Sequence, residues 1–214
     1  FLRHRKHLGI PSEMSADGVV QLMERGVINN SRKTLHHAIS VANFLMGTKR
    51  LYDFVNHNPD FELYPVDVVN APSVIAQNHH MISINSCIQV DLTGQVNSES
   101  MGTTQFSGSG GQMNFVDGAT DSHHGKSIIA TTSTTRDGKI SKIVPVLDLG
   151  ATVTTIRTNV DYIITEYGIA RLTRRTIRER AISLINVAHP DFRPELKKAF
   201  EERFHTPFPE GETE

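Results

Sequence analysis

The sequence predicts an α/β protein whose strands form a layered open sheet. Three observations favour this class: short runs rich in isoleucine and valine, intervening segments with apolar residues at helical spacing, and turn-forming residues between the two. With 214 residues the chain is long enough to bury a core, and one domain is the simplest arrangement.

The N-terminal part alternates between helix and strand. Apolar residues recur at helical spacing in residues 15–25, with Ser15 as the expected N-cap and Gly26 as the stop. Residues 39–46 are mostly apolar and end at Gly47, which predicts a buried strand. A short helix is expected next, through Leu51, Phe54 and Val55.

Strands dominate the middle of the sequence, and helices its end. Thr93-Gly94 is the expected turn between strands within residues 81–96, and Arg136-Asp137-Gly138-Lys139 the hairpin turn between the next two strands. Four strands are predicted at residues 127–134, 140–147, 152–155 and 160–165. Helices are predicted over residues 176–187 and from near Pro194, the latter burying Leu196, Phe200 and Phe204, with a loose tail after Pro207.

Composition limits the partners. Lysine and arginine (22) nearly balance aspartate and glutamate (23), so no strong field favours nucleic acid or an anionic membrane, and a small-molecule substrate fits better. The single cysteine excludes an intrachain disulfide, and no apolar run approaches the roughly 20 residues of a membrane span. We expect a soluble, cytoplasmic protein.

The first seven residues contain no initiator methionine and no apolar signal-peptide core. They resemble the last turns of a helix. We therefore expect the natural protein to extend upstream and this chain to be a fragment of it.

A glycine-rich segment, Phe106-Ser107-Gly108-Ser109-Gly110-Gly111-Gln112, allows close backbone approach and leaves amide donors for an anion or oxyanion. It has neither the Walker A nor the Rossmann glycine order. Two interpretations stay open: an anion-binding loop and a plain turn from strand to helix.

Three histidine pairs, His36-His37, His79-His80 and His123-His124, raise the question of a metal site. Adjacent residues of a strand point to opposite faces, and no established metal-ligand spacing accompanies the pairs, so surface or partly buried histidines are the favoured interpretation. Cys87 lies in a predicted strand and is interpreted as a small core residue rather than a nucleophile.

Glu13 lies between Pro11 and the predicted helix, among apolar neighbours. The positive end of that helix would keep the carboxylate ionised and nucleophilic. Most glutamates are solvated surface charges, so the residue pattern alone leaves that interpretation open as well.

Four segments then occur together in one order: Leu8-Gly9-Ile10-Pro11-Ser12-Glu13-Met14, Asp91-Leu92-Thr93-Gly94-Gln95-Val96-Asn97, Gly108-Ser109-Gly110-Gly111-Gln112 and Thr165-Glu166-Tyr167-Gly168-Ile169-Ala170. With them the chain resembles the C-terminal domain of the acetyl-CoA hydrolase/transferase family, and most closely its 4-hydroxybutyrate and butyrate/acetate CoA-transferase members. The likeness runs from Leu8 to about Leu196. It implies a single lobe of the CoA-transferase (NagB/RpiA-like) type, with all of residues 1–214 forming the C-terminal domain and the N-terminal lobe absent.

The resemblance also implies site residues. Glu13 stands where the family has its nucleophilic glutamate, and Gly108, Gly110 and Gly111 match the stretch lining the thioester site. Asn70 matches a position whose amide faces the acyl group, and Arg136 a basic position near the CoA nucleotide. Asn114 and His123-His124-Gly125-Lys126 depart from the family pattern, which puts contacts around the CoA loop in doubt.

The implied activity is CoA transfer between short-chain carboxylic acids, such as acetate with butyrate or 4-hydroxybutyrate, through a glutamyl-CoA thioester in acetate metabolism. Coenzyme A is a substrate, and neither a metal nor a tightly bound cofactor is expected. The expected partners are acyl-CoA, a short-chain carboxylate and the missing lobe, and a homodimer is a reasonable assembly. Two alternatives stay open: an acyl-CoA hydrolase using the same glutamate, and a catalytically inert CoA-binding lobe.

Overall fold

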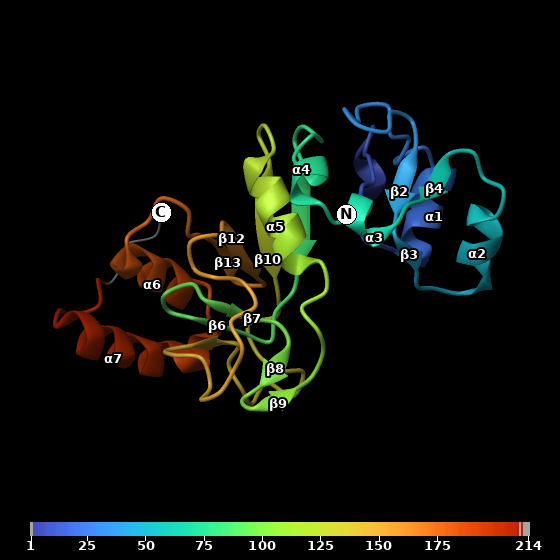
Figure 1. The fold of residues 1–214 in the computed structure, drawn as a ribbon. Helices are drawn as coiled ribbons and strands as arrows, with labels where there is room; N and C mark the ends of the chain where they lie inside the picture. Colours follow the sequence, from blue (N-terminus) through green and yellow to red (C-terminus); the bar gives the residue numbers. More distant parts are fainter. Residues whose placement is uncertain (1, 210, 212–214) are drawn as a thin grey trace. The chain divides into compact units, whose positions relative to one another are not determined.

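The computed structural model describes residues 2–209 and 211, and its contacts separate two compact units. Unit 1 comprises Phe1–Met81 with Asp121–Gly125, and unit 2 comprises Ile82–Thr120 with Lys126–Glu214. Each unit is described by itself, with the elements labelled in Figure 1. Within the described residues, no helix has the length and apolar character needed to span a membrane.

Unit 1 is built on short parallel strand pairs. β1 (Met14–Ser15) pairs with β3 (Phe44–Leu45), and β2 (Ser40–Ala42) pairs with β4 (Phe61–Leu63). The helices of this unit are η1 (Leu2–His4), α1 (Asp17–Glu24), α2 (Lys49–Val55), α3 (Val66–Val69) and α4 (Pro72–Ile75). Its most deeply buried apolar side chains include Val20, Val41, Ala42, Leu51 and Ile75.

The predictions for unit 1 are confirmed in part, since residues 39–46 form two short strands of different sheets, β2 and the partly exposed β3, rather than one buried strand. Gly26 ends α1 as expected, with a positive φ of 66° and its N–H bonded to the Met23 carbonyl. Ser15, however, is a strand residue in register with Leu45, and α1 is capped by Ala16 without a side-chain hydrogen bond. The predicted Ser15 N-cap is therefore wrong, because pairing with β3 holds Ser15 in β1.

Unit 2 contains a four-stranded sheet in the order β13-β12-β10-β5. The strands β5 (Ile82–Asn85), β10 (Lys126–Ala130) and β12 (Tyr162–Thr165) are parallel, and β13 (Gly168–Arg171) is an antiparallel edge strand that the sequence did not predict. The smaller strands are β6 (Gln89–Asp91), β7 (Val96–Asn97), β8 (Ser100–Met101), β9 (Thr104–Gln105) and β11 (Ile143–Val144). The helices are α5 (Gln112–Asp121), α6 (Ile177–Asn186), η2 (Pro190–Phe192) and α7 (Arg193–Phe204).

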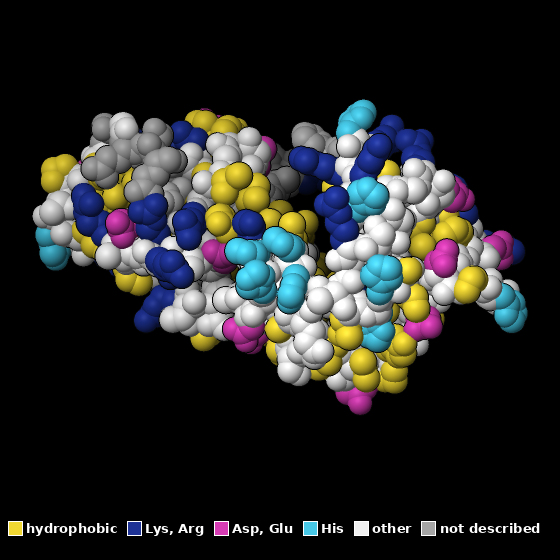
Figure 2. All heavy atoms as spheres, turned by 90° about the horizontal axis from the view of Figure 1, so that it is seen from above, with side chains coloured by type: hydrophobic (Ala, Val, Ile, Leu, Met, Phe, Trp, Pro, Cys, Tyr) yellow, Lys and Arg dark blue, Asp and Glu magenta, His cyan; other side chains and the backbone are white. Residues whose placement is uncertain are grey.

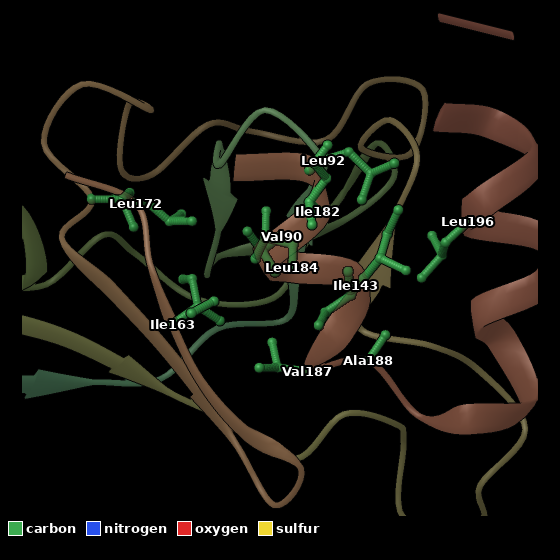
Figure 3. Packing of buried hydrophobic residues seen from close by; sticks show 14 of the residues in the cluster. Val90, Leu92, Ile143, Ile163, Leu172, Ile182, Leu184, Val187, Ala188 and Leu196 are labelled. Atoms are coloured by element: carbon green, nitrogen blue, oxygen red, sulfur yellow. The ribbon is translucent and has the colours of Figure 1, made fainter. Parts of the chain in front are cut away.

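The core of unit 2 joins strands of the four-stranded sheet and of a three-stranded sheet, β11-β6-β7, to the C-terminal helices. In Figure 3, Leu196 of α7 points toward Ile143 and Ala188. Both predicted C-terminal helices are confirmed, and α6 carries a complete capping box from Thr176 and Glu179. Cys87 belongs to this core, where burial raises the pKa of its thiol, so its interpretation as a core residue is confirmed.

Three predictions for unit 2 are wrong in part. The turn at Gly138 forms, and the bridge Thr134↔Ser141 and backbone hydrogen bonds join the chain on either side of it, but β10 and β11 belong to different sheets. Residues 152–155 form a single bridge to Val96 rather than a strand. Phe208 is buried against Phe200, so the tail after Pro207 is anchored there; residues 210 and 212–214 lie outside the described residues.

Candidate active site

Glu13 directly precedes β1, in the middle of a stretch, residues 11–15, that runs parallel to residues 41–45. Its carbonyl oxygen accepts hydrogen bonds from the amides of Asn43, at 2.8 Å, and Phe44, at 3.1 Å. The glutamate is half-buried. The neighbouring strand therefore fixes the backbone of Glu13 at the start of β1.

The helix that follows Glu13 already has a carboxylate in its first turn. Asp17 begins α1 and accepts hydrogen bonds from the backbone N–H and the hydroxyl of Thr48. Because β1 separates Glu13 from α1, Asp17 takes the helix-end position that the sequence suggested for the glutamate. The backbone of the neighbouring strand therefore fixes Glu13 more directly than the helix does.

Two buried polar residues that the sequence analysis missed support the strand leading to Glu13. The Ile10 amide donates to Asn30 Oδ1 at 3.0 Å, while Lys33 Nζ donates to the carbonyls of Ile10, at 3.4 Å, and Ile39, at 2.6 Å. Desolvation lowers the pKa of Lys33 to about 8, although the charge of Glu62 opposes the shift. These contacts span twenty or more residues of sequence for Ile10, so no local pattern indicates them.

Asn70 lies in unit 1 with Glu13 and forms the C-cap of α3. Its side chain is buried, and within the described residues Oδ1 has no hydrogen-bond partner. A buried polar atom without a partner costs about 1–3 kcal/mol, and the described residues contain three others, Ser15 Oγ, Asn78 Oδ1 and Ser127 Oγ. A ligand group is one partner that would satisfy Asn70 Oδ1.

The glycine-rich segment connects β9 to α5 in unit 2. Gly108 and Gly110 are exposed, and Gly110 has a positive φ of 53°, which an L side chain rarely adopts. Gly111 is buried and accepts a hydrogen bond from the Phe115 amide in the first turn of α5. The segment is thus a strand-to-helix turn that leads into the positive end of a ten-residue helix, an arrangement also suited to an anion.

Arg136 is exposed on the turn that Gly138 closes in unit 2. The same turn is rigid, because the Thr135 side chain and the Lys139 amide both donate to Asp137 Oδ1. The predicted residues therefore fall into two sets: Glu13 and Asn70 in unit 1, and Gly108, Gly110, Gly111 and Arg136 in unit 2.

The fourth family-like segment serves to hold elements together. Glu166 accepts hydrogen bonds from the Ser133 amide at 2.9 Å and the Ser133 hydroxyl at 2.6 Å. Burial raises the pKa of this carboxyl, but the bonds from Ser133, its own backbone and nearby His189 together keep the pKa below its usual value. Thr165 Oγ1 donates to the Val187 carbonyl at 2.6 Å, which ties β12 to the end of α6.

Four histidines that the sequence placed in separate pairs form one cluster in unit 1. The rings of His123 and His124 lie 4.0 Å apart, His80 stacks on His124 at 5.1 Å, and His79 approaches His123 at 5.2 Å. Figure 2 shows histidine side chains gathered in a compact group. Within residues 2–209 and 211, no group of three or more histidine, cysteine, aspartate or glutamate side chains is arranged to hold a metal ion.

The comparisons with known proteins agree in one assignment. Residues 47–200 match the model of the acetyl-CoA hydrolase/transferase C-terminal domain. The chain is 58% identical over 204 residues to the 4-hydroxybutyrate coenzyme A transferase of Clostridium kluyveri, covering 95% of the chain and 48% of that protein. It is 29% identical to the acetyl-CoA hydrolase of Neurospora crassa over 92% of the chain and 36% of that protein.

Solved structures give the same result. The crystal structure of RipA from Yersinia pestis superposes with a TM-score of 0.89 at 46% identity, covering 95% of this chain and 46% of that one. A 4-hydroxybutyrate CoA-transferase from Porphyromonas gingivalis gives 0.80 at 46% identity, covering 93% and 46%. The chain thus spans about half the length of the relatives it matches, and the predicted single-lobe α/β fold is confirmed.

Proposed function

Because the chain belongs to the acetyl-CoA hydrolase/transferase family, whose C-terminal domain it matches, we propose that it supplies the nucleophile of a CoA-transferase. The observation that carries the proposal is the place of Glu13, a half-buried glutamate within a stretch paired in parallel with residues 41–45, with its backbone carbonyl held by the amides of Asn43 and Phe44. The substrates are acyl-CoA and a short-chain carboxylate, as in acetate exchanged with butyrate or 4-hydroxybutyrate.

The reaction proceeds as two half-reactions. The Glu13 carboxylate attacks the acyl-CoA carbonyl carbon, the carbon–sulfur bond breaks, and CoA leaves as the thiolate with a mixed anhydride on the enzyme. The thiolate then attacks the glutamyl carbonyl carbon, releases the first carboxylate and forms glutamyl-CoA. A second carboxylate reverses both steps, so no net proton is transferred and ping-pong kinetics follow.

The remaining predicted residues act on charge that develops in these steps. Each tetrahedral intermediate carries an oxyanion, to which the backbone N–H groups of Gly110 and Gly111 and the side-chain Nδ2 of Asn70 are assigned as donors. One such donor contributes about 3–4 kcal/mol to transition-state stabilisation. Arg136 and the loop at Gly108 are assigned to the phosphate-bearing part of CoA, and coenzyme A is a substrate throughout rather than a resident cofactor.

A hydrolase is the second candidate, favoured by the acetyl-CoA hydrolase among the relatives. It would use the same glutamate and admit water to glutamyl-CoA. The discriminating experiment gives acyl-CoA to the full-length protein and follows acyl exchange and free CoA as acetate is raised. A transferase forms acetyl-CoA in proportion to acetate, whereas CoA release that ignores acetate rejects the proposal.

The chain by itself is a different case, because its relatives are about twice as long. We expect the isolated chain to bind CoA weakly and to turn over no substrate. Calorimetric titration with CoA, with and without the remaining half, tests this. Equal affinity in both titrations would show that this half alone makes the CoA site.

A further inference from the structure

The four-stranded sheet of unit 2 has two faces of different character. Pairing places Ile84, Ile128 and Tyr162 in one row across β5, β10 and β12, and the antiparallel edge strand adds Ile169 opposite Ile164. Residues of alternate position point to opposite sides of a sheet, so these side chains share one face with Ile82. The other face carries Ser83, Ile129, Ile163 and Ala170.

The second of these faces is covered, whereas the first is exposed at its edge strands and half-buried at Ile128, Tyr162 and Ile164. Ile129, Ile163 and Ala170 are at most 1% exposed and pack with Val116 of α5 and the apolar residues of α6. In Figure 1, α5 lies along β10. On the first face, Ile82 is 54% exposed, Ile84 67% and Ile169 66%. Isoleucines at both edges of the sheet thus lie open to solvent.

A partly exposed apolar face is unusual for this kind of sheet. Sheets of parallel strands occur with both faces covered, and contiguous exposed apolar patches mark interaction sites. A surface-facing strand would instead alternate isoleucine with polar residues directed to water. The sequence of β5, Ile82-Ser83-Ile84-Asn85, does the reverse, with its isoleucines on the exposed face.

The edges of this face add features that a partner would meet. Lys126, in register with Ile82, and Arg171, in register with Tyr162, are both exposed and give the apolar patch a basic border. At the β13 edge a groove of about 460 Å³ opens between the strand and α6, with Ile169, Arg171 and Ile182 in its lining. The partner surface should therefore be apolar, bear acidic residues at its border and offer a side chain to the groove.

We propose that the half of the full-length polypeptide that the relatives carry and this chain lacks docks on the face formed by Ile82, Ile84, Ile128, Tyr162, Ile164 and Ile169. The match covers 95% of this chain but only 48% of the Clostridium kluyveri relative, so that relative carries a further segment of similar length. A segment of that length is large enough to cover a sheet. The inference concerns assembly and does not depend on Glu13 chemistry.

The experiment pairs the chain with the N-terminal half of the Clostridium kluyveri enzyme, produced separately. The dissociation constant is measured by calorimetry for the chain, for the Ile84→Ser/Ile169→Ser double variant, and for a control, Ile140→Ser/Leu149→Ser, whose residues are also exposed but lie outside the sheet. Losing two buried isoleucines should weaken binding about 100-fold. The control should bind like the unchanged chain, and circular dichroism melting checks that each variant folds.

Hydroxyl-radical footprinting gives an independent measurement on the same samples. Ile84 and Ile169 should be labelled freely in the chain alone and become protected in the complex, with Leu149 labelled equally in both. Absence of binding by the unchanged chain, equal binding by the sheet-face variant, or protection of Ile84 before the other half is added would each overturn the proposal. So would sedimentation showing a dimer of the chain that the sheet-face variant abolishes, since a second copy would then be the occupant. No outcome depends on turnover, so the result stands apart from the proposed function.

Discussion

Ile10, three residues before Glu13, has both of its backbone polar groups held by buried side chains. Asn30 accepts from its amide and Lys33 donates to its carbonyl. Asn30 Nδ2 also donates to Ser40 Oγ at 2.9 Å, so the two neighbouring strands are tied together behind the glutamate. The position of the proposed nucleophile is thus set by residues that never approach substrate chemically.

Lys33 makes stability depend on pH. Its pKa is about 8 in the folded chain, against about 10.4 for an unfolded lysine. Between these values the unfolded chain binds more protons, so the free energy of unfolding should rise by about 2 kcal/mol from pH 7.5 to 9.5. Urea denaturation at several pH values measures this rise in the free energy of unfolding. Lys33→Met should remove the rise, whereas a flat or falling profile for the unchanged protein contradicts the shift.

Asn30 and Asn70 offer a matched pair of buried amides. Asn30→Ala removes two hydrogen bonds and should cost about 2 kcal/mol of stability. Asn70→Ala removes a side chain whose Oδ1 lacks a partner in the described chain, so stability should change by less than about 1 kcal/mol. In the full-length enzyme, however, its kcat should fall about 100-fold. A kcat unchanged by Asn70→Ala would remove this residue from the site.

Among individual residues, the sequence predicted the candidate site residues but not the residues that hold them in place. Glu13, Asn70 and the glycines follow from ordered segments that resemble a family. Asn30, Lys33 and the histidine cluster depend on contacts between distant parts of the chain, as in the bond from the His80 amide to the His123 carbonyl. The spacing of residues along the sequence does not indicate such contacts.

The turn from β9 into α5 is the element whose role most needs testing. Gly110 and Gly26 both have positive φ, 53° and 66°, and an added Cβ at either would meet open space. Alanine should therefore cost each site a similar strain of about 1–2 kcal/mol. Only Gly110→Ala should also lower kcat/KM for acyl-CoA, by about tenfold, since a Cβ there would obstruct a ligand on the backbone amides. Equal kcat/KM for both variants would leave the loop as a turn alone.

Elements with strong local signals were predicted well, and those defined by their partners were not. α6 has a capping box and α7 a regular buried stripe, and both form. The turn at Gly138 also forms, yet β10 pairs in parallel with β5 and β12 instead of returning as a hairpin. A turn motif specifies a local reversal, whereas strand pairing is decided by the whole sheet.

For the molecule as a whole, the sequence predicted the fold class and the family, and the comparisons confirm both. The exposed sheet face was not predicted, because the alternating sequence of a strand such as Ile82–Asn85 does not indicate which face of the sheet will be buried. The buried serine and exposed isoleucines there reverse the usual pattern, and the docking proposed above would give that reversal a physical reason.

The central claim is that Glu13 carries coenzyme A as a thioester. The direct measurement incubates the full-length enzyme with acyl-CoA, traps the intermediate with hydroxylamine and identifies the modified peptide by mass spectrometry. Glu24, an exposed glutamate paired with Arg50, provides the control variant. We expect a hydroxamate on Glu13 that forms only with acyl-CoA, is lost in Glu13→Gln and is retained in Glu24→Gln. Modification at another residue, or normal turnover by Glu13→Ala, would contradict it.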